Sequence, residues 1–139
     1  MFKLAVITEE ISQDPAVAAA MMREFGGQGL EICSASEKGP HELDDTVIAH
    51  LKQIAEAHWL HIRDIAPPVF KWHFGVGEDE RKHLAMLHRC IALVHALGTS
   101  LIRIFTFWQQ LDPPPWELLR LAAQEGIILG IENARTTMG

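Results

Sequence analysis

The amino-acid sequence predicts an α/β fold of the parallel (β/α) barrel type, with about five of the eight βα units of a closed barrel. Short apolar runs alternate with helical patterns along the chain, which indicates parallel strands joined by right-handed crossovers. Most of the runs are almost continuously apolar, as expected for strands covered on both faces. No glycine-rich phosphate-binding pattern follows the first run, so a barrel is favoured over an open nucleotide-binding sheet.

We expect one domain over residues 1–139, an incomplete barrel in which strands and helices alternate throughout. The first strand is predicted at residues 3–8. Asp14 then caps a helix that has Pro15 at its first position and Gly26 after its end. Further strands are predicted at residues 29–34, 60–66, 101–107 and 127–133, and further helices after Asp44 or Asp45, at residues 79–97 and at residues 116–125.

The composition is that of an ordinary globular protein, since 48% of the 139 residues are hydrophobic and 22% are charged. The formal net charge of −6 disfavours nucleic acid and anionic membranes as partners. Cys33 and Cys90 form no CxxC pair or ligand cluster, and we expect them to be free thiols of a reducing compartment. Because the sequence shows no signal-peptide pattern and no apolar stretch of membrane-spanning length, a cytoplasmic location is expected.

Charged and aromatic side chains gather where the predicted strands end and loops begin, which is where parallel α/β folds carry their sites. Carboxylates, an arginine and aromatic rings at one rim would suit a small polyhydroxylated ligand. The residues at these strand ends are Glu9 and Glu10, Glu31, Asp64, Lys71 with Trp72 and His73, Arg103 with Trp108, and Glu132 with Asn133.

Several of these residues also have a plain structural interpretation. Glu9 and Glu10 can be solvated loop residues, and Lys71 can belong to an ordinary exposed loop. Glu31 lies within an apolar run and, if buried, must be paired or face a ligand. For Glu31, an ion pair with Arg103 and a contact with substrate stay open as equal alternatives.

Glu132 is the strongest candidate for a chemical role. Strand alternation places Ile128, Gly130 and Glu132 on one face, and Gly130 leaves space beside the carboxylate. We therefore favour a metal or acid–base role for Glu132 over a structural ion pair.

The eight histidines do not predict a metal site. The sequence contains no HExxH pattern, and no two of His83, His88 and His95 are four residues apart. We expect the helical histidines to lie mostly at the surface, whereas His61 and His73 retain the alternative of lining a pocket.

Five stretches taken together resemble the sugar phosphate isomerase/epimerase family, namely AVITEEISQD, LEICS, KGPHELDD, LIRIFTFWQ and LGIEN. The resemblance implies a xylose isomerase-like TIM barrel, a sugar or sugar phosphate as substrate and a role in carbohydrate metabolism. It also implies a divalent metal (Mn²⁺, Mg²⁺, Co²⁺ or Zn²⁺) that stabilises the enediolate formed when a proton moves beside a carbonyl. By the same resemblance, Glu132 is the first metal ligand and takes part in proton transfer. The residues expected to line the substrate pocket are Glu10, Glu31, Lys71, Arg103 and Trp108.

The resemblance covers only the N-terminal part of that barrel. The remaining metal ligands would come from strands beyond Gly139, and Met138 stands near the place of a second catalytic carboxylate. We therefore expect catalysis only when the barrel is completed, and metal need not bind to this chain alone. The alternative is a non-catalytic half-barrel module or a truncated fragment that self-associates, for example as a homodimer. An abasic-site endonuclease of the same superfamily is disfavoured by the acidic balance.

Overall fold

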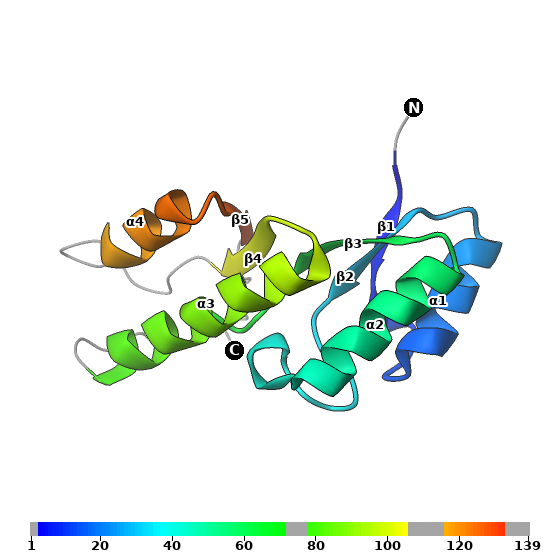
Figure 1. Cartoon of the computed structure of the whole chain (residues 1–139), viewed down its shortest axis with the longest axis horizontal. Coiled ribbons are helices and arrows are strands. Elements are labelled where there is room, and N and C mark those ends of the chain that lie inside the picture. The colour runs from blue at the N-terminus through cyan, green and yellow to red at the C-terminus, as the bar shows by residue number, and fades with distance from the viewer. Residues whose placement is uncertain (1–2, 72–77, 106–115, 133–139) are drawn as a thin grey trace, which may run out of the picture.

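Five parallel strands form one sheet, in which they follow one another in chain order (Figure 1). The computed structural model describes residues 3–71, 78–105 and 116–132. Each strand pairs with the next in parallel, as in an α/β barrel, so the predicted fold class is confirmed. The strands are β1 (Ala5–Ile7), β2 (Gly29–Ile32), β3 (His61–Ile65), β4 (Leu101–Phe105) and β5 (Ile128–Glu132).

The helices connect successive strands and pack against one another along one side of the sheet (Figure 1). Two of the expected N-caps form: the side chain of Asp14 accepts from Ala16 N at 2.9 Å, and that of Asp44 accepts from Val47 N at 3.0 Å. Asp44, and not Asp45, therefore caps the second helix. The helices are α1 (Pro15–Glu24), α2 (Asp45–Ala57), α3 (Glu78–Leu97) and α4 (Trp116–Gln124), with short 3-10 turns η1 (Thr8–Glu10) and η2 (Pro40–Glu42).

The hydrophobic core lies between the sheet and the helices. Alternate strand residues, such as Leu30 and Ile32 on β2 and Ile102 and Ile104 on β4, are buried in it. The strand residues that alternate with these buried ones, including Glu31 and Arg103, therefore point to the face of the sheet that the described helices do not cover. No helix in the described ranges is long and apolar enough to cross a membrane.

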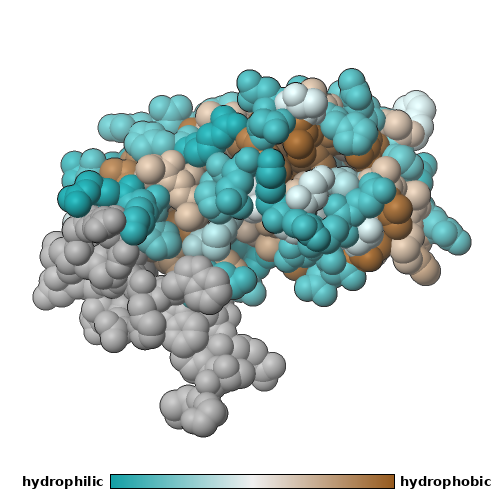
Figure 2. Space-filling model, turned by 90° about the horizontal axis from the view of Figure 1, so that it is seen from below, coloured by the Kyte–Doolittle hydropathy of each residue, from teal (hydrophilic) through white to brown (hydrophobic). Residues whose placement is uncertain are grey.

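The apolar residues that recur at helical spacing along α1 do not face the core. Val17 and Met21 on α1 and Phe25 just after it recur at helical spacing, yet all three are exposed, because α1 packs through Ala18, Ala19 and Met22. The face in Figure 2 is largely hydrophilic, with apolar surface in its middle and at the end of the molecule that carries α1.

His83 is buried, although we expected the helical histidines to lie mostly at the surface. Its Nδ1 accepts the backbone N–H of Phe70 at 3.2 Å, and its ring stacks on the Phe70 ring. A buried backbone N–H needs an acceptor, and the imidazole ring supplies one here.

The chain leaves each described helix through a residue with left-handed backbone geometry. That residue is a glycine after three helices, Gly26, Gly98 and Gly126, with φ values of 75°, 76° and 67°. After α2 it is Trp59, which has φ 57° and a side chain that is 81% exposed. A bulky residue is strained in this conformation, and so exposed a side chain gains little packing in return.

Replacement of Trp59 by glycine is therefore expected to stabilise the fold. Trp59→Gly should raise the free energy of unfolding by roughly 0.5 to 1 kcal/mol, measured by urea denaturation followed by circular dichroism. The matched control is Gly126→Ala, where an added Cβ would meet no atom within 4 Å. It should lower the same free energy by roughly 1 kcal/mol, because only the backbone conformation is disfavoured. A clear loss of stability in Trp59→Gly would contradict this interpretation.

Candidate functional site

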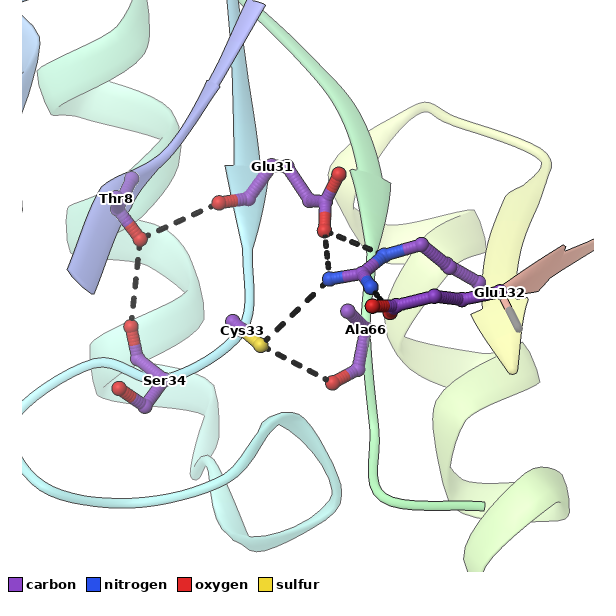
Figure 3. A network of polar contacts seen from close by, with 7 residues as sticks. Thr8, Glu31, Cys33, Ser34, Ala66 and Glu132 are labelled. Atoms are coloured by element: carbon purple, nitrogen blue, oxygen red, sulfur yellow. Dashed lines mark hydrogen bonds and ion pairs between the residues drawn. The ribbon is translucent and has the colours of Figure 1, made fainter. Parts of the chain in front are cut away.

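Side chains of opposite charge meet on the open face of the sheet, at the C-terminal ends of its strands. Arg103 reaches from β4 across β3 to Glu31 on β2, where its Nε donates to Glu31 Oε1 at 2.7 Å. Its Nη2 forms an ion pair with the same oxygen, and its Nη1 forms an ion pair with Glu132 Oε2 on β5. Figure 3 shows Glu31 and Glu132 pointing toward one another from opposite sides of this guanidinium. The side chains of Arg103 and Glu31 are only 19% and 16% exposed, whereas that of Glu132 is 43% exposed.

A β-bulge adds Asp64 to this group. Leu30 on β2 pairs with Ile62 on β3, but the next residue, Glu31, pairs with Asp64, so Arg63 is an extra residue in β3. The shift turns Asp64 to the same face as Glu31, where simple alternation would put it with Ile62 on the core face. We call Glu31, Asp64, Arg103 and Glu132 the arginine cluster.

The pKa of the Asp64 carboxyl in the arginine cluster is raised well above its ordinary value. Burial raises its pKa from 3.8 to about 6, and the negative charge of Glu31 and a side-chain hydrogen bond with Glu31 raise it further in the same direction. Arg103 and Arg63 act against this rise. Below about pH 6 Asp64 holds its proton, and above that pH the cluster carries three carboxylates and one guanidinium.

Cys33 borders the arginine cluster as a neutral thiol. Burial raises its pKa to about 11, and the nearby Glu9 carboxylate adds to the rise. The thiol donates to the carbonyl oxygen of Ala66 at 3.6 Å, and its sulfur lies 3.9 Å from Arg103 Nη2 (Figure 3). Cys33 and Cys90 are both free thiols, as the sequence predicted. At neutral pH neither is a nucleophile, because only the thiolate reacts readily.

Hydrogen bonds between neighbouring strand ends hold this rim together. The Thr8 hydroxyl, at the end of β1, donates to the carbonyl oxygen of Glu31 at 3.3 Å (Figure 3). The Ser34 hydroxyl, just after β2, donates to the Glu9 carboxylate. These bonds join β1 and η1 to the backbone of β2 that carries Glu31.

The structure brings together four of the strand-end residues named from the sequence: Glu31, Asp64, Arg103 and Glu132. Of the two alternatives for Glu31, it contains the ion pair with Arg103. It also pairs Glu132 with Arg103, which is the alternative that we favoured less for this carboxylate. The pairing faces the open side of the sheet and leaves Glu132 partly accessible, so an acid–base role stays a prediction.

The other predicted residues lie at the margin of the arginine cluster or outside the described ranges. Lys71 Nζ lies 5.3 Å from the centroid of the Phe105 ring, and the same centroid is 5.8 Å from Arg103 Cζ. Glu10 is exposed on η1, whereas its neighbour Glu9 makes the contact with Ser34. Trp108, Trp72, His73 and Asn133 fall outside the described residues.

The raised pKa of Asp64 predicts how stability depends on pH. A carboxyl whose folded-state pKa is raised contributes stability below pH 3.8 that is lost as pH rises through about 6. Asp64→Asn removes this loss, so the variant should gain stability relative to the wild type between pH 4 and pH 7, by up to about 3 kcal/mol. Urea denaturation across this range measures the difference.

Asp45→Asn is the matched control for Asp64→Asn, because the Asp45 side chain is 99% exposed. Its difference from the wild type should stay nearly constant with pH. A constant difference for Asp64→Asn as well would show that Asp64 titrates normally.

No protein-family model matches the sequence, and no curated protein matches it significantly. Solved structures do match. One is a sugar phosphate isomerase/epimerase from Parabacteroides distasonis ATCC 8503, with a TM-score of 0.65 and 15% identity, covering 94% of this chain and 51% of that chain. Another is the 3-keto-D-glucoside 4-epimerase of E. coli, with a TM-score of 0.61 and 17% identity, covering 84% of this chain and 50% of that chain.

A third is a xylose isomerase-like TIM barrel protein from Mycobacterium smegmatis in complex with magnesium. It has a TM-score of 0.60 and 19% identity, covering 84% of this chain and 45% of that chain. The chain thus spans about half the length of the solved structures that it matches. At these identities the likeness concerns the fold, and it confirms the fold that the resemblance implied. The chain has the fold of part of a xylose isomerase-like TIM barrel, the fold of sugar phosphate isomerase/epimerase proteins.

Proposed function

We propose that this chain supplies one side of an active site that moves a proton beside the carbonyl group of a sugar or sugar phosphate. One observation carries the proposal: a largely buried guanidinium lies between two carboxylates at the C-terminal ends of the strands. This is the end of a parallel barrel at which active sites are built. The names of the structural neighbours support the substrate class.

The proposed reaction uses both signs of charge in the arginine cluster. Removal of a proton beside a carbonyl places negative charge on the carbonyl oxygen, and a fixed cation stabilises that charge. Glu31 holds the Arg103 guanidinium by a hydrogen bond and an ion pair, so Arg103 is the group that we assign to the substrate oxygen. When the substrate oxygen accepts a hydrogen bond from Arg103 Nη1, the Glu132 carboxylate is released from Arg103 and can accept the proton.

Lys71 is proposed as a further contact to substrate, because its ammonium group lies over the Phe105 ring near Arg103. A phosphate or a hydroxyl group at the mouth of the site would suit it. Glu10 and Trp108 stay predictions as pocket residues.

The residues of the described ranges do not fit a divalent metal ion. No group of three or more His, Cys, Asp or Glu side chains in these ranges could hold one, and the Glu132 carboxylate is paired with Arg103. The proposed function therefore assigns no step to a metal in this chain. The Mn²⁺, Mg²⁺, Co²⁺ or Zn²⁺ ion expected of a complete barrel would need ligands from further strands.

The second candidate is a non-catalytic half-barrel that self-associates. Strand β5 is at the edge of the sheet, and its residues Ile128 and Ile131 are 62% and 68% exposed. An open edge with exposed apolar side chains favours pairing with another chain, for example in a homodimer.

Light scattering and solvent-deuterium exchange together test the proposal. Size-exclusion chromatography with light scattering gives the oligomeric state, and NMR follows deuterium entering the carbon beside the carbonyl of ketoses and ketose phosphates. We expect exchange from an assembled form that completes the barrel, and a loss of about 100-fold or more in Glu132→Gln. Glu117→Gln, a change of the same kind on the exposed surface of α4, should leave the exchange rate unchanged.

Each outcome of this experiment decides between the two candidates. A dimer without exchange supports the self-associating module. A monomer contradicts completion of the barrel by self-association. An assembled form in which Glu132→Gln exchanges at the wild-type rate contradicts the catalytic assignment.

A further inference from the structure

A small cavity opens at the N-terminal ends of β1, β2 and β3, the end of the sheet opposite to the arginine cluster. Its volume is about 200 Å³. The lining residues that matter here are Lys3, Leu4, Gly29, Trp59, His61 and Arg63. The proposed function makes no use of this cavity.

Trp59 is placed at this cavity at a cost to the fold. It has left-handed backbone geometry at a helix end where α1, α3 and α4 are followed by glycine. Its side chain lines the cavity, yet 81% of its surface stays exposed. The backbone geometry at this position favours glycine, so the tryptophan is not explained by folding alone. Because the indole ring is exposed, a ligand in the cavity can pack against it.

Arg63 reaches the same cavity because Gly29 leaves room for it. A Cβ atom added at Gly29 would lie 2.4 Å from Arg63 Cγ, so any other residue would displace the arginine stem. Arg63 is exposed, and among the described residues its guanidinium makes no hydrogen bond or ion pair. The β-bulge that turns Asp64 toward Glu31 leaves Arg63 as the extra residue of β3.

The charges around the cavity have one sign. Lys3 and Arg63 are the charged residues that line it, and no carboxylate does so within the described ranges. This contrasts with the net charge of −6 for the chain. A larger cavity of about 630 Å³ shares His61 and Arg63, but its wall contains Glu56, so its charge is mixed. The smaller cavity is therefore the one suited to an anion.

We propose that this cavity binds a small carboxylate with a flat apolar body, such as an aromatic acid. The ring packs on Trp59 and Leu4, and the carboxylate pairs with Arg63, whose planar guanidinium matches it in shape and charge. The volume accommodates one six-membered ring with its carboxylate. This site is separate from the proposed active site and does not depend on it.

Benzoate is the probe, and the reporter is the indole N–H resonance of Trp59 in the full chain. The resonance is assigned by its disappearance in Trp59→Gly. We expect benzoate to shift it saturably with a dissociation constant of about 1 mM or lower. Benzyl alcohol has the same ring without the charge, and it should bind about tenfold more weakly or not at all.

Two variants separate the contributions of charge and ring. Arg63→Gln should weaken benzoate binding about tenfold. Arg120→Gln, its matched control on the exposed surface of α4, should leave binding unchanged. Trp59→Gly should also weaken benzoate binding about tenfold. Because this variant lacks the indole reporter, its binding is measured from the backbone amide resonance of Gly29. Circular dichroism should show that the variant is folded.

Three results would each overturn the proposal: no saturable shift at about ten times the expected dissociation constant, equal binding of benzyl alcohol, or wild-type affinity in Arg63→Gln.

Discussion

The neutralisation of Arg103 is the interaction on which the open face of this sheet depends. A guanidinium this deeply buried is tolerated only with carboxylates close to it, and Glu31 and Glu132 provide them from strands on either side. The ion pairs of Arg103 link β2, β4 and β5 on this face, and the Phe105 ring lies beside the guanidinium. The opposite face holds its strands to the helices by the burial of leucine and isoleucine.

The two ends of the sheet have opposite electrostatic character. At the C-terminal end, Glu31, Glu132 and Asp64 outnumber Arg103. At the N-terminal end, Lys3 and Arg63 line the small cavity. The bulge in β3 contributes to both ends, because one extra residue leaves Arg63 over Gly29 and turns Asp64 toward Glu31. A single local irregularity thus sets the charge of two separate regions.

Arg103 also changes what the carboxylate at the end of β5 can do. At the strand ends of a parallel barrel, a carboxylate can bind a metal ion or transfer a proton. Here the guanidinium provides the positive charge beside Glu132, so the carboxylate is neutralised within the chain. The Glu132 side chain is 43% exposed and that of Glu31 is 16% exposed, although the Glu132 oxygen paired with Arg103 is itself buried.

The sequence by itself determined the features that depend on near neighbours along the chain. The alternation of strands and helices and the caps at Asp14 and Asp44 follow from local patterns. Alternation within one strand likewise placed Glu132 on the same face as Gly130.

Only the tertiary structure decided the features that depend on which strand lies opposite which. Simple alternation puts Asp64 on the core face, and the bulge reverses this because the register between β2 and β3 shifts by one residue. The choice of Glu132 as a second partner of Arg103 requires β4 and β5 to be side by side. The burial of His83 and the exposure of Val17 and Phe25 likewise depend on how each helix turns toward the sheet. Periodicity fixes the spacing of side chains on an element, but packing against other elements decides which face is buried.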